Sequence, residues 1–91
     1  MISRERLSRY AEDHDIELIF FDPPEYFDKA IVGLVHGYGQ EMAVLYDQER
    51  VLSAMAKDMG REAAEEWFDF NTLGAYLGDA TPRFVLRGPD I

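Results

Sequence analysis

Four carboxylates recur at helical spacing in the second half of the chain. We call them the acidic stripe: Glu62, Glu65, Glu66 and Asp69. Positions i, i+3, i+4 and i+7 share one face of a helix. Carboxylates that perform acid–base catalysis need burial and unequal surroundings, which separate their pKa values. An exposed stripe offers neither condition, so it is interpreted as a solvated helix face or as a binding surface for a cationic protein.

Polar side chains that follow the stripe suggest a second candidate site. Asn71 comes one helical turn after Trp67, which predicts that its amide lies on the apolar face of the helix. A buried amide must find hydrogen-bond partners, so Asn71 and Thr81 are expected to tie the helix end and the following loop to the sheet. The alternative is a small polar pocket for a ligand, formed by Tyr46, Asn71, Tyr76 and Thr81.

Metal binding and nucleophilic catalysis find little basis in the sequence. The chain has no cysteine, which excludes disulfides and thiolate sites. Asp13, His14 and Asp15 are consecutive, so their side chains diverge and cannot close one coordination shell. His14 instead completes an apolar helix stripe and is expected to be half-buried. No serine stands in a Gly-x-Ser-x-Gly turn. We therefore expect no metal, no cofactor and no enzymatic activity.

Composition and charge narrow the class of partner. A chain of 91 residues with 47% hydrophobic residues is expected to form one folded domain, residues 1–91. Nine Lys and Arg against 18 Asp and Glu give a net charge of −9, which argues against direct binding of nucleic acid or an anionic membrane. No apolar run suits a membrane-spanning helix or a signal peptide. We therefore expect a soluble cytoplasmic protein.

The elements that must position these residues follow from hydrophobic periodicity. Helices are predicted over residues 3–14, 48–58 and 61–72, with Ser3 and Asp47 as N-caps of the first two. Strands are predicted over residues 16–21, 29–36, 41–46 and 83–86. The run 16–21 is almost continuously apolar and is expected to be a central strand covered on both faces. The next two strands form a hairpin, and the last strand lies at an edge.

This order of elements predicts an α+β fold. A small, mainly antiparallel sheet of three or four strands would pack against helices, in the order helix, strand, strand, strand, helix, helix, strand. Three or four strands suffice for stability when a helical layer covers the sheet. The helix over 61–72 would then present the acidic stripe to solvent.

A set of short motifs resembles a known group of proteins. Tyr46-Asp47 precedes a helix, and Phe70-Asn71, Gly74-Ala75, Gly78 and Thr81-Pro82 follow it. This pattern resembles a family of small acidic proteins that are common in bacteriophages and prophages and are mostly uncharacterised. The resemblance assigns no catalytic residue. It implies a phage-type protein that inhibits host machinery, such as a CRISPR or other host-defence complex, by occupying a basic surface.

Three functional hypotheses follow. The leading one is a non-enzymatic binding module whose acidic stripe meets a basic, nucleic-acid-handling host protein, because opposite charges steer association. The second is a homo-oligomeric structural or accessory protein, such as a homodimer, that uses exposed aromatic side chains such as Tyr26, Phe27 and Tyr38. The third is a small-ligand-binding protein, or an enzyme, that uses the predicted polar pocket.

Overall fold

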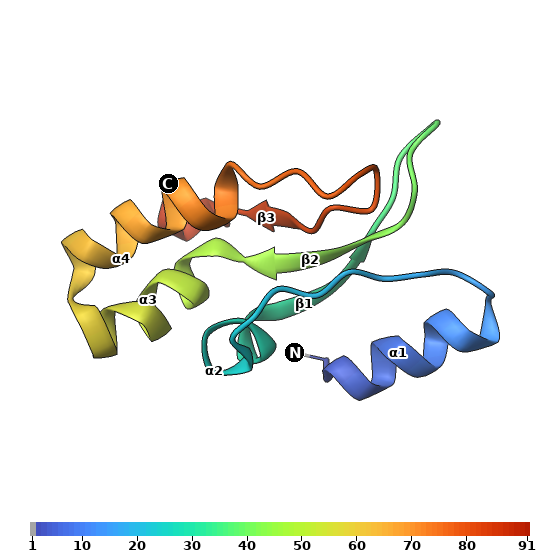
Figure 1. Ribbon diagram of the computed structural model, residues 1–91, viewed down its shortest axis with the longest axis horizontal. Helices are drawn as coiled ribbons and strands as arrows, with labels where there is room; N and C mark the ends of the chain where they lie inside the picture. The colour runs from blue at the N-terminus through green and yellow to red at the C-terminus, as the bar shows by residue number, and fades with distance from the viewer. Residues whose placement is uncertain (1) are drawn as a thin grey trace.

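The computed structural model describes residues 2–91 and has an α+β fold. Its elements are α1 (Arg4–Asp13), α2 (Pro24–Phe27), η1 (Asp28–Ala30), β1 (Ile31–Val35), β2 (Ala43–Asp47), α3 (Gln48–Met59), α4 (Arg61–Phe68), η2 (Asp69–Leu73), β3 (Arg83–Val85) and η3 (Gly88–Asp90). The sheet lies in the middle of an elongated molecule that measures 39 × 25 × 25 Å. The helices α3 and α4 lie side by side at one end, and α1 lies at the other (Figure 1).

The sheet contains three strands in the order β1-β2-β3. β1 and β2 form the predicted antiparallel hairpin, whereas β3 pairs in parallel with the other side of β2. Parallel neighbours need a crossover connection, and here α3, α4 and the loop after them supply it. The sheet is therefore mixed, and β3 lies at an edge as predicted.

Residues 16–21 form no strand, and the prediction of a central strand there is wrong. The segment crosses the sheet without joining its ladder (Figure 1). Side chains bind both backbone groups of Phe21: its N–H donates to Tyr46 Oη at 3.0 Å, and its carbonyl accepts from Arg4 Nη2 at 3.0 Å. The apolar run covers the core with side chains such as Leu18 and Phe20. Partial burial of these side chains against the core thus accounts for the apolar composition that suggested a strand.

An aromatic cluster fixes the helices on the sheet. Its members are Phe21, Phe27, Tyr46, Phe68 and Phe84. Tyr46 and Phe84 are partners across β2 and β3, and their ring centroids lie 5.8 Å apart. Phe68 of α4 meets Phe84 edge-on at 4.8 Å, a favourable geometry for aromatic pairs. α4 is thereby anchored to β3 through one side chain.

The helix starts follow the predicted caps. Ser3 Oγ accepts the Arg6 N–H at 3.1 Å, and Asp47 Oδ1 accepts the Arg50 N–H at 3.2 Å. Asp47 is buried, and its Oδ2 lies 2.9 Å from Arg87 Nε without the alignment of a hydrogen bond. Charge alone therefore stabilises this second oxygen. The cap of α3 is thus also the point that holds the C-terminal segment.

The helix predicted over 61–72 changes its geometry before it ends. α4 stops at Phe68, and residues 69–73 form a wider π-helical turn. The wider turn changes which side chains face inward. Thr72 is buried, whereas Asn71 is exposed, so the prediction that Asn71 lies on the apolar face is wrong.

Candidate functional site

The acidic stripe lies on α4 and the first residue of η2, and all four of its side chains are exposed. Its members are not equivalent, however. Glu65 Oε1 accepts from Arg61 Nε at 2.8 Å, while the other two guanidinium nitrogens bind Glu49 of α3 at 2.6 and 2.9 Å. Glu65 therefore belongs to an ion-pair network that joins α3 to α4. Within residues 2–91, Glu62, Glu66 and Asp69 make no ion pair.

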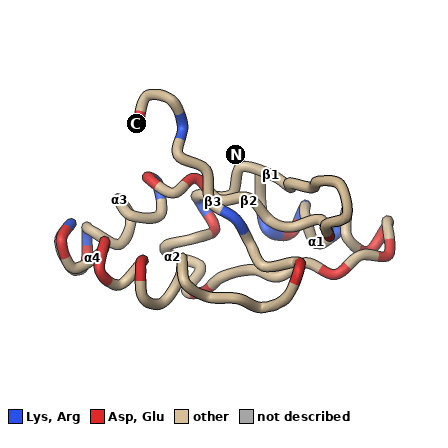
Figure 2. The backbone as a smooth tube through the Cα atoms, turned by 90° about the horizontal axis from the view of Figure 1, so that it is seen from above, with Lys and Arg blue, Asp and Glu red and all other residues tan. Residues whose placement is uncertain are grey.

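The chain carries only negative charges from the acidic stripe to the loop before β3. Between residues 62 and 82 the chain carries five carboxylates and no Lys or Arg. The acidic positions follow one another along α4 (Figure 2). The fifth carboxylate, Asp79, accepts a hydrogen bond from Tyr76 Oη at 3.3 Å. An approaching protein therefore meets negative charge at both ends of the stretch.

Four large apolar side chains that follow the stripe in the sequence are exposed. Phe70 is 85% exposed, Tyr76 76%, Leu73 54% and Leu77 53%. We call residues 70–77 the apolar segment. The apolar segment was not predicted, because Phe70 lay within the helix predicted over 61–72, whose inner face was assigned to Trp67 and Asn71, and the other three residues lay beyond that helix. The signal for it in the sequence is the density of large apolar residues at and beyond the end of the predicted helix.

The structure does not bring the four residues of the predicted polar pocket together. Tyr46 is buried in the aromatic cluster, where burial raises the pKa of its hydroxyl. Asn71 Nδ2 donates to the Trp67 carbonyl at 3.2 Å, a local helical contact. Tyr76 and Thr81 do line a common hollow at the start of β3, and neither Tyr46 nor Asn71 lines it.

Thr81 closes the loop between η2 and β3. Its Oγ1 donates to the Gly78 carbonyl at 2.6 Å and accepts the Leu77 N–H at 2.7 Å. These bonds stay within the loop, whereas the expected role tied the loop to the sheet. They fix residues 77–81, so the end of the apolar segment has a defined conformation.

His14 and the three aromatic residues suggested for self-association differ in exposure. His14 is exposed, contrary to the half-buried position predicted, and its ring stacks on Tyr10 with centroids 3.9 Å apart. Phe27 is buried, Tyr26 is partly buried, and Tyr38 is fully exposed at the hairpin tip. Of the three aromatics suggested for self-association, only Tyr38 is largely exposed.

Two further findings concern metals and membranes. Over residues 2–91, no cluster of three or more His, Asp or Glu side chains is placed to hold a metal ion. In the same part of the chain, no helix combines the length and apolar character needed to span a bilayer.

Comparison with known proteins adds no relative. No protein-family model, curated protein or solved structure matches the chain. The resemblance to small acidic phage proteins therefore stays a prediction, and the function must be inferred from the residues of this chain.

Proposed function

We propose that this protein is a non-enzymatic binding module that docks a basic protein on a surface made of the acidic stripe and the apolar segment. The observation that carries the proposal is the exposure of four large apolar side chains on residues 70–77. Monomeric proteins rarely expose contiguous apolar patches of this kind without an interaction role. Burial of one such side chain in an interface is worth about 1.5–3 kcal/mol.

The charges beside the apolar segment favour a basic partner. Lys and Arg side chains of a partner would reach Glu62, Glu66 and Asp69, which have no ion pair of their own in the described chain. Acidic side chains near the end of a helix oppose its dipole, and no basic side chain offsets them there. Glu66 and Asp69, at the end of α4, therefore do little for stability, which supports a role of these two residues in binding.

The same charges disfavour a nucleic-acid ligand, because phosphates would be repelled by five carboxylates with no intervening cation. A protein that handles nucleic acid, by contrast, presents the required basic surface. Inhibition of such a host protein is the specific role that the resemblance to acidic phage proteins would add to this proposal.

Self-association is the second candidate, favoured by the same exposed apolar side chains. Two copies that met through the apolar segment would also bring two acidic stripes close together. Salt screens like charges as well as opposite ones. A homodimer through this surface should therefore strengthen with added salt, whereas a complex with a basic partner should weaken. Light scattering at low and high salt separates the two candidates.

The direct test is a comparison of matched variants in partner capture from nuclease-treated host lysate. A Phe70→Ser/Tyr76→Ser variant removes two apolar anchors, and a Glu66→Lys/Asp69→Lys variant reverses two unpaired charges. Both should weaken capture of the same protein by roughly tenfold, as interface anchors typically do. Tyr38→Ser removes an exposed aromatic outside the surface and should capture as the unmodified protein does. A protein retained equally by all variants would overturn the proposal.

A further inference from the structure

We infer that a separate hollow between α2, η1, α3 and the C-terminal segment binds a small phosphate-bearing anion. The hollow has a volume of about 400 Å³, within the range of small-molecule sites. Its cationic side chains define what we call the cationic hollow: Lys29, Arg50, Lys57 and Arg87. No residue of the acidic stripe or the apolar segment lines it. The inference therefore goes beyond the proposed protein-binding surface.

The cations are distributed unevenly over this acidic chain. Both of its lysines and two of its seven arginines line this one hollow. Arg87 pairs with the buried Asp47 at 2.9 Å, and Arg50 approaches the same carboxylate at 3.8 Å. Lys29 and Lys57, in contrast, make no ion pair within residues 2–91. Like charges that share a hollow repel one another, and no structural pairing compensates the two lysines. An anionic ligand would supply that compensation.

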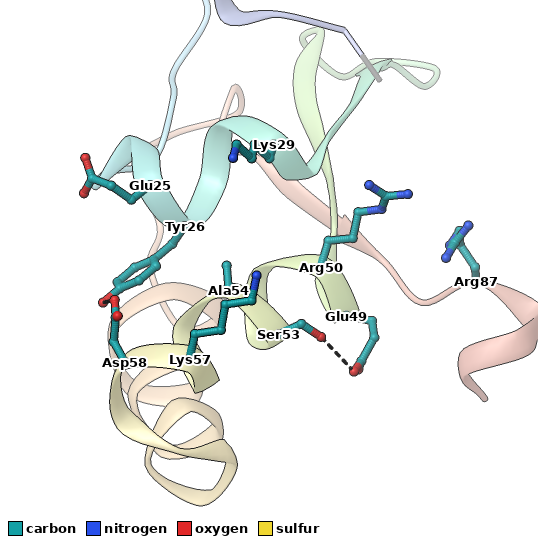
Figure 3. A pocket seen from close by; sticks show the side chains of 10 residues that line it. All are labelled: Glu25, Tyr26, Lys29, Glu49, Arg50, Ser53, Ala54, Lys57, Asp58 and Arg87. Atoms are coloured by element: carbon teal, nitrogen blue, oxygen red, sulfur yellow. Dashed lines mark hydrogen bonds between the residues drawn. The ribbon is translucent and has the colours of Figure 1, made fainter.

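Three acidic side chains also line the hollow, and none of them forms an ion pair with Lys29 or Lys57 in the described residues. Arg61 binds both carboxylate oxygens of Glu49, and Asp58 accepts a hydrogen bond from Tyr26 Oη at 2.8 Å. The third acid, Glu25, points its carboxylate away from Lys29 and Lys57 (Figure 3). The ammonium groups of the two lysines are consequently left to an external anion.

The shape of the hollow fits an anion held from two sides. Lys29 extends from η1 above the hollow, and Lys57 lies on the facing side of α3, with Ala54 between them (Figure 3). Arg50 occupies the same face of α3 as Lys57, two helical turns away. Lysine binds phosphate as a point charge, and arginine adds a planar fork of donors. A hollow with cationic side chains on two facing sides suits a phosphate dianion.

The negative net charge of the molecule favours a small anion over a long one. A long polyanion would extend beyond the hollow and meet the excess of carboxylates that gives the chain its charge of −9. A compact anion experiences the local cations while avoiding most of that repulsion. The site therefore favours a small phosphorylated molecule over a nucleic-acid strand.

The test is a titration of the full chain with pyrophosphate at constant ionic strength, followed by amide chemical shifts in NMR spectra. Amides of residues 25–30 and 49–58 should shift in a saturable manner. Lys29→Gln and Lys57→Gln should each weaken binding by about fivefold, and the double variant should lose it. Arg9→Gln, which removes an exposed cation of α1 that makes no ion pair in the described residues, is the matched control and should bind within about twofold of the unmodified protein.

Two results would overturn the inference. One is the absence of saturable shifts in those two segments. The other is equal weakening by Arg9→Gln and the lysine variants, which would mean that pyrophosphate responds to total charge. Circular dichroism of each variant confirms that the fold is retained, as expected for substitutions of exposed side chains.

Discussion

At the scale of single residues, Tyr46 links the core to the segment that precedes α2. Its ring is fully buried, and its hydroxyl accepts the Phe21 N–H at 3.0 Å. An unsatisfied amide in a partly buried position costs free energy, because the group loses water without gaining a partner. One hydroxyl thus replaces the ladder hydrogen bond that a strand would have supplied.

Tyr46→Phe tests this account. The substitution keeps the ring and removes only the acceptor, so the free energy of unfolding should fall by about 1 kcal/mol. Hydrogen exchange at the Phe21 amide should accelerate more than at amides of β1. Tyr10→Phe, which changes an exposed tyrosine of α1, should leave both quantities unchanged. Unaltered exchange at Phe21 in Tyr46→Phe would contradict the account.

Features that depend only on neighbouring residues, such as helix caps, were predicted correctly from residue types. Ser3 and Asp47 were identified as N-caps because a cap needs only a short polar side chain before a helical pattern. The predicted orientation of Asn71 was wrong, because it depends on a π-helical turn that a period of 3.6 residues does not describe. The exposure of Phe70 was missed for the same reason.

At the scale of elements, α3 and α4 are joined by packing and by the network of Arg61 with Glu49 and Glu65. The Arg61 guanidinium lowers the pKa of Glu49 below its ordinary value of 4.5. A carboxyl with a lowered folded-state pKa adds stability that is complete above the unfolded pKa. That stability is lost as the pH falls through the folded pKa.

Arg61→Gln removes the network and its pH dependence together. At neutral pH the variant should be less stable by about 0.5–1 kcal/mol, as for other exposed ion-pair networks. The difference from the unmodified protein should shrink as the pH falls from 4.5 through the lowered pKa of Glu49, because below that pKa Glu49 is protonated in both proteins. Urea unfolding of both proteins across this pH range measures the difference in the free energy of unfolding. A difference that does not change with pH would argue against the network.

Glu66→Lys tests whether the acidic stripe is present for binding or for stability. The lysine would pair with Glu62 one turn earlier, remove repulsion with Asp69 and suit the later part of the helix. The free energy of unfolding should rise by about 0.5 kcal/mol. Glu17→Lys, in an irregular segment, should change it by less than about 0.3 kcal/mol. A clear loss of stability in Glu66→Lys would assign the stripe a structural role.

The strand predicted over 16–21 shows the limit of pattern reasoning for elements. A short, continuously apolar run indicates burial without stating whether the backbone joins a sheet. Here the apolar side chains of the run are partly buried against the core, and Arg4 and Tyr46 bind the backbone of Phe21. The hairpin, in contrast, was predictable from two alternating segments around a glycine-containing turn.

At the scale of the whole molecule, charge is segregated over the surface. Residues 62–82 carry only acidic charges, whereas both lysines line the cationic hollow. Composition predicted the sign of the net charge, and the order of the predicted elements indicated the α+β class. It does not predict this segregation, since residues 29, 50, 57 and 87 meet only after the chain folds.

We propose that the molecule is a small scaffold with two separate binding regions, one for a protein and one for an anion. The scaffold is held by the aromatic cluster and by the buried Asp47, which pairs with Arg87. The two lysines and the residues of the acidic stripe and the apolar segment chosen for substitution contact neither Asp47 nor the aromatic cluster through an ion pair or hydrogen bond, so these variants should leave the fold intact. This separation makes the functional claims testable one at a time.

The central claim is that the acidic stripe and the apolar segment bind a basic protein, and the salt dependence of that binding tests it most directly. The affinity of the captured partner should fall as salt is raised, because screening weakens the attraction between opposite charges. Glu66→Lys/Asp69→Lys should bind more weakly at low salt and show a shallower dependence. An affinity that rises with salt, or a slope unchanged by the charge reversal, would contradict the claim.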